Sequence, residues 1–205
     1  DTKGHREGGV VWHTQGSGKS LTMVMLAKAI ALAPDIPNPR VVLVTDRVDL
    51  DDQINGTFRA CGLEPQKAKS GSDLADLLNH GKATIVTTLI HKFEAALRRG
   101  VALAPGQNLF VLVDEAHRGQ SGDLHAALQV GLPNCARIGF TGTPILMGDK
   151  KRTHEIFGEF IDRYTIREAE LDGAIVPILY EGRTAQGAIK DDANLDELFE
   201  DLFRD

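Results

Sequence analysis

The glycine-rich segment at residues 13–20 constrains the fold more than any other feature of the chain. It reads His-Thr-Gln-Gly-Ser-Gly-Lys-Ser, and it lies between an apolar run of strand length at residues 10–13 and a stretch of helical periodicity at residues 21–32. A strand that turns through glycines into a helix lets backbone N–H groups close around phosphate oxygens, next to the positive helix N-terminus. The segment therefore predicts a phosphate-binding loop in an α/β domain.

The loop also carries the side chains that nucleotide phosphates need. Lys19 would reach the terminal phosphates, and the Ser20 hydroxyl would hold Mg²⁺. His13 stands where the general pattern has its first glycine. Trp12 precedes it, and packing beside a bound base and packing in the core both remain open for its indole. A chance glycine-rich turn is the alternative, which the strand-to-helix position disfavours. The predicted nucleotide-binding residues are Thr14, Gln15, Gly16, Ser17, Gly18, Lys19 and Ser20.

Further apolar runs of strand length follow, separated by stretches of helical periodicity. Strands that are apolar on both faces and alternate with helices are typical of a buried parallel sheet. We therefore expect a three-layer α/β/α domain with a central, mostly parallel sheet over residues 1–180. The expected strands are 10–13, 41–45, 84–88, 109–114 and 137–141, and the expected helices are 21–32, 74–78, 89–97 and 124–130.

The last part of the chain follows a different pattern. Residues 145–160 are rich in charge and glycine, and we expect them to be irregular. Residues 164–171 predict a short helix that Asp172 and Gly173 end. Residues 175–180 predict a strand that Pro177 restricts to an edge or a connector. Residues 181–205 predict an acidic helical segment, whose apolar positions at helical spacing are Leu195, Leu198, Phe199, Leu202 and Phe203.

Composition restricts the class of protein. The chain has 205 residues, 42% of them apolar and 25% charged, as in an ordinary globular domain. No apolar run approaches the roughly 18–20 residues of a membrane span. Residues 181–205 contain eight acidic and three basic residues, so most of the net charge of −6 lies there. The nearly neutral body would not bind DNA by charge alone. Two cysteines, Cys61 and Cys135, favour a reducing, cytoplasmic setting. Because the chain begins at Asp1 without a leader, we expect it to be a piece of a longer protein.

A second motif stands at the end of a predicted strand. Residues 109–113 run directly into Asp114-Glu115-Ala116-His117, which puts two carboxylates over the carboxyl edge of the sheet. Asp114 would orient Mg²⁺, and Glu115 would position and deprotonate an attacking water. Taken alone, the quartet also fits an acidic helix N-terminus. The predicted catalytic residues are Lys19, Asp114, Glu115 and His117, and the predicted metal ligands are Ser20 and Asp114.

A third motif, residues 139–144, ends the next predicted strand and reads Gly-Phe-Thr-Gly-Thr-Pro. Thr141, Gly142 and Thr143 would form a coupling element beside the nucleotide. His117 would link the nucleotide to this element. A polar turn is the alternative for this segment alone.

The three motifs, in this order, resemble the first motor domain of superfamily 2 helicases and translocases. The residues within the motifs resemble more specifically those of the R (restriction and motor) subunit of type I restriction–modification enzymes. The similar segments include Trp-His-Thr-Gln at the start of the loop and Asp-Glu-Ala-His-Arg-Gly-Gln at residues 114–120. The family often has serine where Gly119 stands. Residues 45–50, 86–93 and 161–183 are also similar to segments of this family, so the resemblance covers roughly residues 8–183.

This resemblance implies a RecA-like P-loop NTPase domain that uses ATP and Mg²⁺ to translocate double-stranded DNA. It implies as partners a second motor domain and a nuclease domain of the same parent chain, together with specificity and methyltransferase subunits. Residues 181–205 would then lead towards the second motor domain. No membrane partner is implied.

In such a family Arg47, Ser70, Thr87 and Thr88 would lie near the DNA and contact phosphates without reading bases. Each has an alternative. Arg47 would pair with Asp46 at a helix entry, Ser70 would cap the helix that contains residues 74–78, and the two threonines would simply end a strand.

Two other functions remain open. A translocase of the chromatin-remodelling type shares Asp-Glu-Ala-His and Thr-Gly-Thr-Pro with this chain, but its loop usually lacks the Trp-His-Thr-Gln lead. A non-catalytic interaction module would keep the fold and lose hydrolysis, which the presence of Lys19, Ser20, Asp114 and Glu115 disfavours.

Overall fold

Seven parallel strands form the central sheet. The computed structural model describes residues 7–46, 48–79, 84–98, 108–116, 132, 135–144 and 153–177. The strands are β1 (Gly9–His13), β2 (Arg40–Thr45), β3 (Gln66–Lys67), β4 (Ile85–Leu89), β5 (Leu109–Val113), β6 (Ala136–Thr141) and β7 (Phe160–Tyr164). They lie in the order β3-β4-β2-β5-β6-β1-β7, and every described pairing is parallel. The predicted α/β architecture with a parallel sheet is confirmed.

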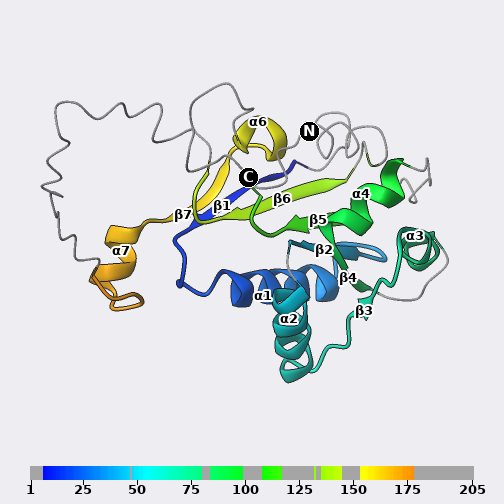
Figure 1. Cartoon of the computed structure of the whole chain (residues 1–205), viewed down its shortest axis with the longest axis horizontal. Helices are drawn as coiled ribbons and strands as arrows, with labels where there is room; N and C mark the ends of the chain where they lie inside the picture. The colour runs from blue at the N-terminus through cyan, green and yellow to red at the C-terminus, as the bar shows by residue number, and fades with distance from the viewer. Residues whose placement is uncertain are drawn as a thin grey trace, which may run out of the picture.

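Helices cover both faces of this sheet (Figure 1). The helices are α1 (Lys19–Leu32), α2 (Val48–Ala60), α3 (Gly71–Asn79), α4 (Ile90–Arg98), α6 (Thr153–Phe157) and α7 (Ile166–Leu171). Helices α1 and α2 pack with one apolar cluster, which contains Met23, Ile54 and Phe58. Helices α3, α4 and α6 pack with a second cluster, which contains Leu74 and Phe93. Two apolar clusters on opposite faces of one sheet give the three layers that the sequence predicts.

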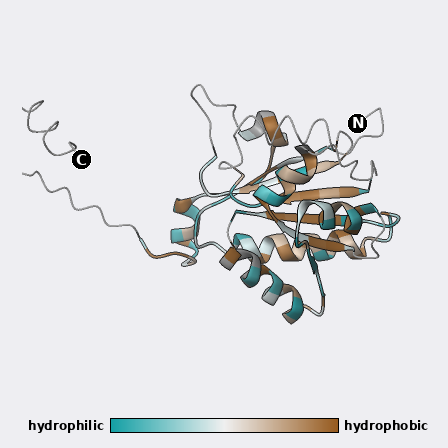
Figure 2. Cartoon of the chain, turned by 45° about the vertical axis from the view of Figure 1, so that its right-hand side comes forward, coloured by the Kyte–Doolittle hydropathy of each residue, from teal (hydrophilic) through white to brown (hydrophobic). Residues whose placement is uncertain are grey.

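The central strands owe their position to side chains that are apolar on both faces. Every residue of β4 and β5 is buried, as is every residue of β2 after Arg40. Figure 2 shows these strands as a mostly hydrophobic layer between more mixed helices. Strands of this kind are stable only with helices on both sides. Their carboxyl ends share one edge of the sheet, which is where the three motifs lie.

Several elements differ from the sequence-based expectation. Helix α2 was not predicted, because it is largely polar and buries only a narrow apolar face that includes Ile54 and Phe58. Residues 145–160 were expected to be irregular, but their described part contains α6 and the start of β7. The helix expected over residues 164–171 begins at Ile166, because Tyr164 ends β7 and Thr165 caps the helix in a capping box with Glu168.

The strand predicted for residues 175–180 is wrong for its described part, which ends at Pro177. The N–H groups of Ala174 and Ile175 donate to the carbonyl of Ala169, at 2.9 and 3.2 Å, and so close the end of α7. These amides are therefore not free to pair with a strand, and Pro177 has no N–H group. The helix predicted at residues 124–130 and the acidic segment at residues 181–205 lie outside the described residues. None of the described helices has the length and apolar character to cross a membrane.

Candidate functional site

The loop between β1 and α1 has the backbone of a phosphate cradle. Gly16 and Gly18 have φ values of 84° and 89°, in the left-handed region that glycine alone adopts easily. A Cβ atom at Gly18 would meet no atom within 4 Å, so backbone conformation rather than crowding requires a glycine there. No side chain caps α1, and its first N–H groups therefore remain available to an anion. Ser17 Oγ donates to the Thr14 carbonyl at 2.6 Å and holds the loop closed.

Lys19 lies where the loop meets the third motif. Its Nζ is 3.4 Å from the carbonyl oxygen of Thr14, and a Cβ atom built on Gly142 would lie 3.4 Å from the same Nζ. The ammonium group is thus held between the loop and the end of β6. A long hydrogen bond to one carbonyl is a weak restraint, so the ammonium can turn towards a phosphate oxygen.

Asp114 lies at the carboxyl end of β5 and is 5% exposed. Its N–H donates to Val44 O at 2.9 Å, which places it beside the end of β2. The pKa of Asp114 is raised to about 6, chiefly because burial disfavours its charged form. The backbone N–H of Glu115 and the charge of Lys19 lower this pKa, and the carboxylates of Glu115 and Asp46 raise it. A buried carboxylate whose negative charge is poorly solvated is well suited to hold a cation.

Glu115 has a φ of 47°, which is unusual for a residue with a side chain. The residue after it, Ala116, donates its N–H to the carbonyl of Phe140 at 2.9 Å. The turn after β5 is therefore tied to β6, and Glu115 is carried over the edge of the sheet between them. Backbone strain at such a position marks candidate functional residues.

The third motif contacts the loop directly. Thr141 is fully buried, and its Oγ1 accepts the N–H of Thr143 at 3.1 Å. A Cβ atom on Gly142 would lie 3.3 Å from the N atom of Gln15, so only a glycine fits without displacing the loop. The sheet order β5-β6-β1 brings the three motifs together, since their strands are neighbours with the same direction.

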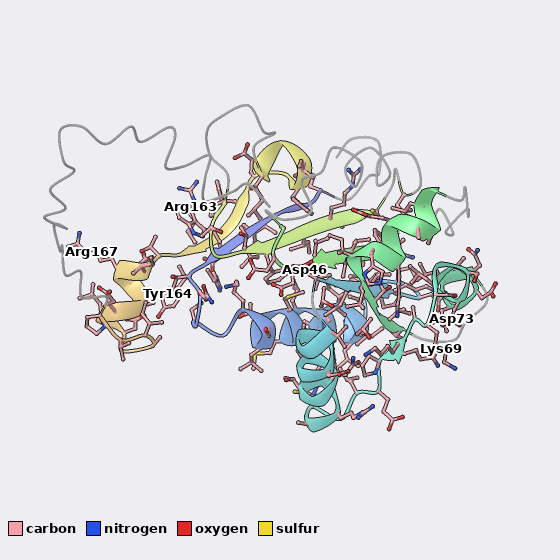
Figure 3. The ribbon with its side chains drawn as sticks, in the orientation of Figure 1. Asp46, Lys69, Asp73, Arg163, Tyr164 and Arg167 are labelled. Atoms are coloured by element: carbon pink, nitrogen blue, oxygen red, sulfur yellow. The ribbon has the colours of Figure 1, made fainter. Side chains whose placement is uncertain are left out.

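Strand β7 supports the loop from the other side of β1, and the sequence did not reveal this. His13 Nε2 lies 2.6 Å from Asp162 Oδ2, and the N–H of Thr14 donates to the carbonyl of Tyr164 at 2.9 Å. The hydrogen bond with His13 lowers the pKa of Asp162. Figure 3 shows Tyr164 between the loop and α7, and its ring contacts His13 edge-on. Beyond α7, Ile175 lies 3.4 Å from the place of a Cβ on Gly16.

The candidate DNA residues have internal contacts where the structure describes them. Ser70 Oγ accepts the N–H of Asp73 at 3.1 Å, so Ser70 caps α3 as its alternative predicted. Figure 3 shows Asp73 and Lys69 at this end of the sheet. Thr87 and Thr88 are 0% and 1% exposed, and Thr87 Oγ1 donates to Asn55 Oδ1 at 3.4 Å. His117 and Arg47 lie outside the described residues.

The side chains at the site suit a magnesium ion that is shared with phosphates. Among the described residues, no group of three or more His, Cys, Asp or Glu side chains could hold a metal ion by itself. Ser20 and Asp114 offer a hydroxyl and a carboxylate, and Mg²⁺ prefers such oxygens and takes its remaining ligands from water and phosphate. The uncapped helix and the two left-handed glycines provide the matching anion cradle. The residues present therefore fit a magnesium nucleotide.

Comparison with known protein families gives a match over the whole chain. A sequence model of the SWI2/SNF2 ATPase family matches residues 1–205. The chain is 39% identical to the endonuclease subunit of the type I restriction enzyme HindI from Haemophilus influenzae, over 87% of its own length and 19% of that protein. It is 32% identical to the endonuclease subunit of the type I restriction enzyme SauCOLORF180P from Staphylococcus aureus, over 82% of the chain and 19% of the relative. The chain thus spans about a fifth of these relatives.

Solved structures show the same fold at low sequence identity. The helicase domain of Hef from Pyrococcus furiosus superposes with a TM-score of 0.59 and 17% identity, over 80% of this chain and 35% of that one. A nuclease-deletion mutant of the Type ISP restriction–modification enzyme LlaGI, in complex with a DNA substrate mimic, gives a TM-score of 0.59 and 18% identity, over 82% and 19%.

Proposed function

Because this chain belongs to the SWI2/SNF2 ATPase family and is related to the endonuclease subunits of type I restriction enzymes, we propose that it is the first RecA-like motor domain of such a subunit. In this proposal ATP hydrolysis drives translocation of double-stranded DNA before cleavage. Residues 1–180 form the motor domain, and residues 181–205 lead towards a second one. The observation that carries the proposal is the position of Lys19, between the phosphate-type loop and the Thr-Gly-Thr motif.

The roles of the residues follow from their chemistry. Residues 14–20 form the phosphate loop. Its backbone N–H groups at the start of α1, those of Gly18, Lys19 and Ser20, would bind the phosphates, and the side chain of Lys19 adds a positive charge. Ser20 and Asp114 would hold Mg²⁺, which neutralises charge on the transferred phosphate. Glu115 orients the attacking water and accepts its proton. His117 would connect this water to Thr141, Gly142 and Thr143.

The remaining partners belong to the same proposal. DNA phosphates would be contacted through Arg47 and Ser70, and through Thr87 and Thr88 only after their buried hydroxyls become accessible. A nuclease domain, a second motor domain, and specificity and methyltransferase subunits would complete a cytoplasmic assembly. The restriction subunits among the relatives favour this assignment over a remodelling translocase.

The test compares the 205-residue chain with the full-length protein that contains it. Motors of this type complete their site with arginines from a second domain, which are typically worth ~10³–10⁵ in rate. We expect the 205-residue chain to bind magnesium nucleotide, to hydrolyse ATP slowly and to respond little to DNA. The full-length protein should show hydrolysis that DNA stimulates. Full DNA-stimulated turnover by the short chain would contradict the two-domain proposal, and absence of nucleotide binding would contradict the proposed function.

A further inference from the structure

The sole tryptophan of the chain joins the strand before the loop to the third motif. Trp12 is the fourth residue of β1, where it pairs with Thr141 of β6 on one side and with Arg163 of β7 on the other. Its indole Nε1 donates a hydrogen bond to the carbonyl oxygen of Gly142 at 3.2 Å. The indole has a single hydrogen-bond donor and no acceptor, so this is the one conventional hydrogen bond that the Trp12 side chain can make.

Gly142 lies close to both the loop and Lys19. A Cβ atom on Gly142 would be 3.3 Å from Gln15 N, 3.4 Å from His13 O and 3.4 Å from Lys19 Nζ. The indole N–H of Trp12 donates to the carbonyl of Gly142, and the N–H of Thr143 donates to the Thr141 hydroxyl. The C=O and the N–H of the peptide group between Gly142 and Thr143 are thus both hydrogen-bonded. This peptide group cannot rotate without breaking one of the two bonds, so a movement of Lys19 against Gly142 acts on a restrained turn.

Aromatic contacts from β7 hold the indole in place. The rings of Trp12 and Phe160 have centroids 5.8 Å apart at an interplanar angle of 44°, within the range of favourable aromatic pairs. The guanidinium of Arg163 lies 4.3 Å from the centroid of Phe160, on the exposed edge strand. Figure 3 shows Arg163 on the outer side of β7. The stack packs against the indole ring, and the hydrogen bond to Gly142 is a separate contact that the stack does not supply.

We propose that Trp12 is a positioning residue that couples the nucleotide loop to the Thr-Gly-Thr motif through the carbonyl of Gly142. The proposal rests on the proposed function, since it assigns a role within the same motor. Lys19 leaves its long contact with Thr14 when it turns to a phosphate, and Gly142 lies against that ammonium. Because Trp12 ties Gly142 to β1, the loop and the motif move together, and the state of the nucleotide reaches the end of β6.

A role in packing alone predicts a different result. If Trp12 only fills space, removal of its N–H has no effect as long as an aromatic ring remains, whereas disruption of the ring stack does. If Trp12 positions Gly142, the order is reversed. Trp12→Phe keeps a ring against Phe160 and removes the donor, and Phe160→Leu keeps the donor and removes the stack. The two variants therefore separate the alternatives.

The first experiment uses the full-length protein that contains this chain. Calorimetry measures the affinity for Mg-ADP, and steady-state assays measure ATP hydrolysis without and with linear double-stranded DNA. We expect Trp12→Phe to lower the ratio of DNA-stimulated to basal rate by about 2- to 10-fold, the effect of one neutral hydrogen bond. Phe160→Leu should change that ratio less. An unchanged ratio in Trp12→Phe, or equal losses in the two variants, would overturn the proposal.

The second experiment uses the unsubstituted chain, so it does not depend on whether a variant folds. In the 205-residue chain all tryptophan emission comes from position 12. Addition of Mg-ADP or of a non-hydrolysable Mg-ATP analogue should change this emission with the dissociation constant that calorimetry gives. Calorimetric binding without any change in emission would overturn the proposal and leave the proposed function intact. Absence of calorimetric binding would instead count against the proposed function.

Discussion

Strands β6 and β7 pair with β1, the strand before the loop, on its two opposite sides, and they differ in how far their side chains are exposed to water. Strand β6 is buried except for Arg137, and the turn after it contacts the loop through Gly142. Strand β7 has three exposed residues in its middle, and it contacts the loop through the side chain of Asp162, which is 63% exposed. The side chains for which we propose catalytic roles lie on the buried side, and the exposed side contacts the loop through β7.

Solvent explains this division. On the buried side the charge of Asp114 is poorly hydrated, so its pKa rises to about 6 and a cation nearby is strongly favoured. On the exposed side the pair between His13 and Asp162 is screened by water, and pairs of this kind contribute little to stability. Substitutions on the buried side should therefore have large effects, and substitutions on the β7 side small ones.

The largest effect is expected at Glu115. In the full-length protein Glu115→Gln should lower the ATP hydrolysis rate by ~10²–10⁴-fold, because the amide cannot accept a proton from water. Mg-ATP affinity should change little, since Glu115 is assigned to the water and not to the metal. Steady-state hydrolysis together with calorimetry measures both. A variant with a near-normal rate would show that another group acts as the base.

A smaller effect is expected at Lys19. Replacement by alanine removes a charge-assisted hydrogen bond worth about 1.5–3 kcal/mol. Affinity of the 205-residue chain for Mg-ADP should fall by about 10- to 150-fold. Lys28→Ala, on the same helix but bonded to the Cys61 carbonyl, is the matched control and should bind normally. Equal affinities for Lys19→Ala and wild type would remove this loop from the site.

Asp114 should make the chain less stable at neutral pH than in mild acid. Its folded-state pKa of about 6 exceeds the ordinary value of 3.8, so the folded state binds this proton more tightly than the unfolded state does. The penalty from Asp114 is therefore absent below the ordinary pKa and grows as pH rises through the window up to about 6.

Asp114→Asn removes this penalty. Without nucleotide or metal, its free energy of unfolding at pH 8 should exceed that of wild type by about 1–3 kcal/mol. The two proteins should become more alike as the pH approaches 4, which urea titrations at several pH values would measure. A variant less stable than wild type at pH 8 would mean that the carboxylate gains more from its contacts than it loses by burial.

The smallest effect is expected on the β7 side. Asp162→Asn weakens an exposed ion pair, so Mg-ADP affinity should change by less than about fivefold, and less at high salt. Because the pKa of Asp162 is lowered, the contribution of the pair is lost only as pH falls through that lowered value. Asp35→Asn, in an exposed loop, controls for the loss of a charge. A loss as large as that of Lys19→Ala would show that both sides of the loop matter equally.

The same difference between buried and exposed strands explains what the sequence could predict. Strands β2, β4 and β5 are recognisable as apolar runs, because strands that are buried on both faces favour apolar residues at successive positions. Strand β7 reads Phe-Ile-Asp-Arg-Tyr, which has no such run, and its pairing depends on β1 far away in the sequence. The sequence also places the loop between β1 and α1 and the Asp-Glu pair at the end of β5, because such motifs combine set residue types at a fixed spacing. Their roles in catalysis stay a prediction.

Contacts between distant segments could not be predicted in this way. The bond from Trp12 to Gly142 and the pair of His13 with Asp162 join residues more than a hundred positions apart. Nothing in the local pattern of either residue indicates its partner. The sequence offered a choice for Trp12 between a base and the core, and the structure shows a third arrangement, a hydrogen bond to the backbone of another motif.

The left-handed backbone at Glu115 has a consequence for how such a protein can change over generations. A side chain in this conformation costs on the order of 1–2 kcal/mol relative to glycine. Glu115→Gly should therefore yield a molecule that melts at a higher temperature and no longer turns over ATP. A laboratory population selected for heat resistance alone would be expected to discard the glutamate early. Glu115 would therefore be retained only under selection for ATP hydrolysis, because its backbone conformation lowers the stability of the fold.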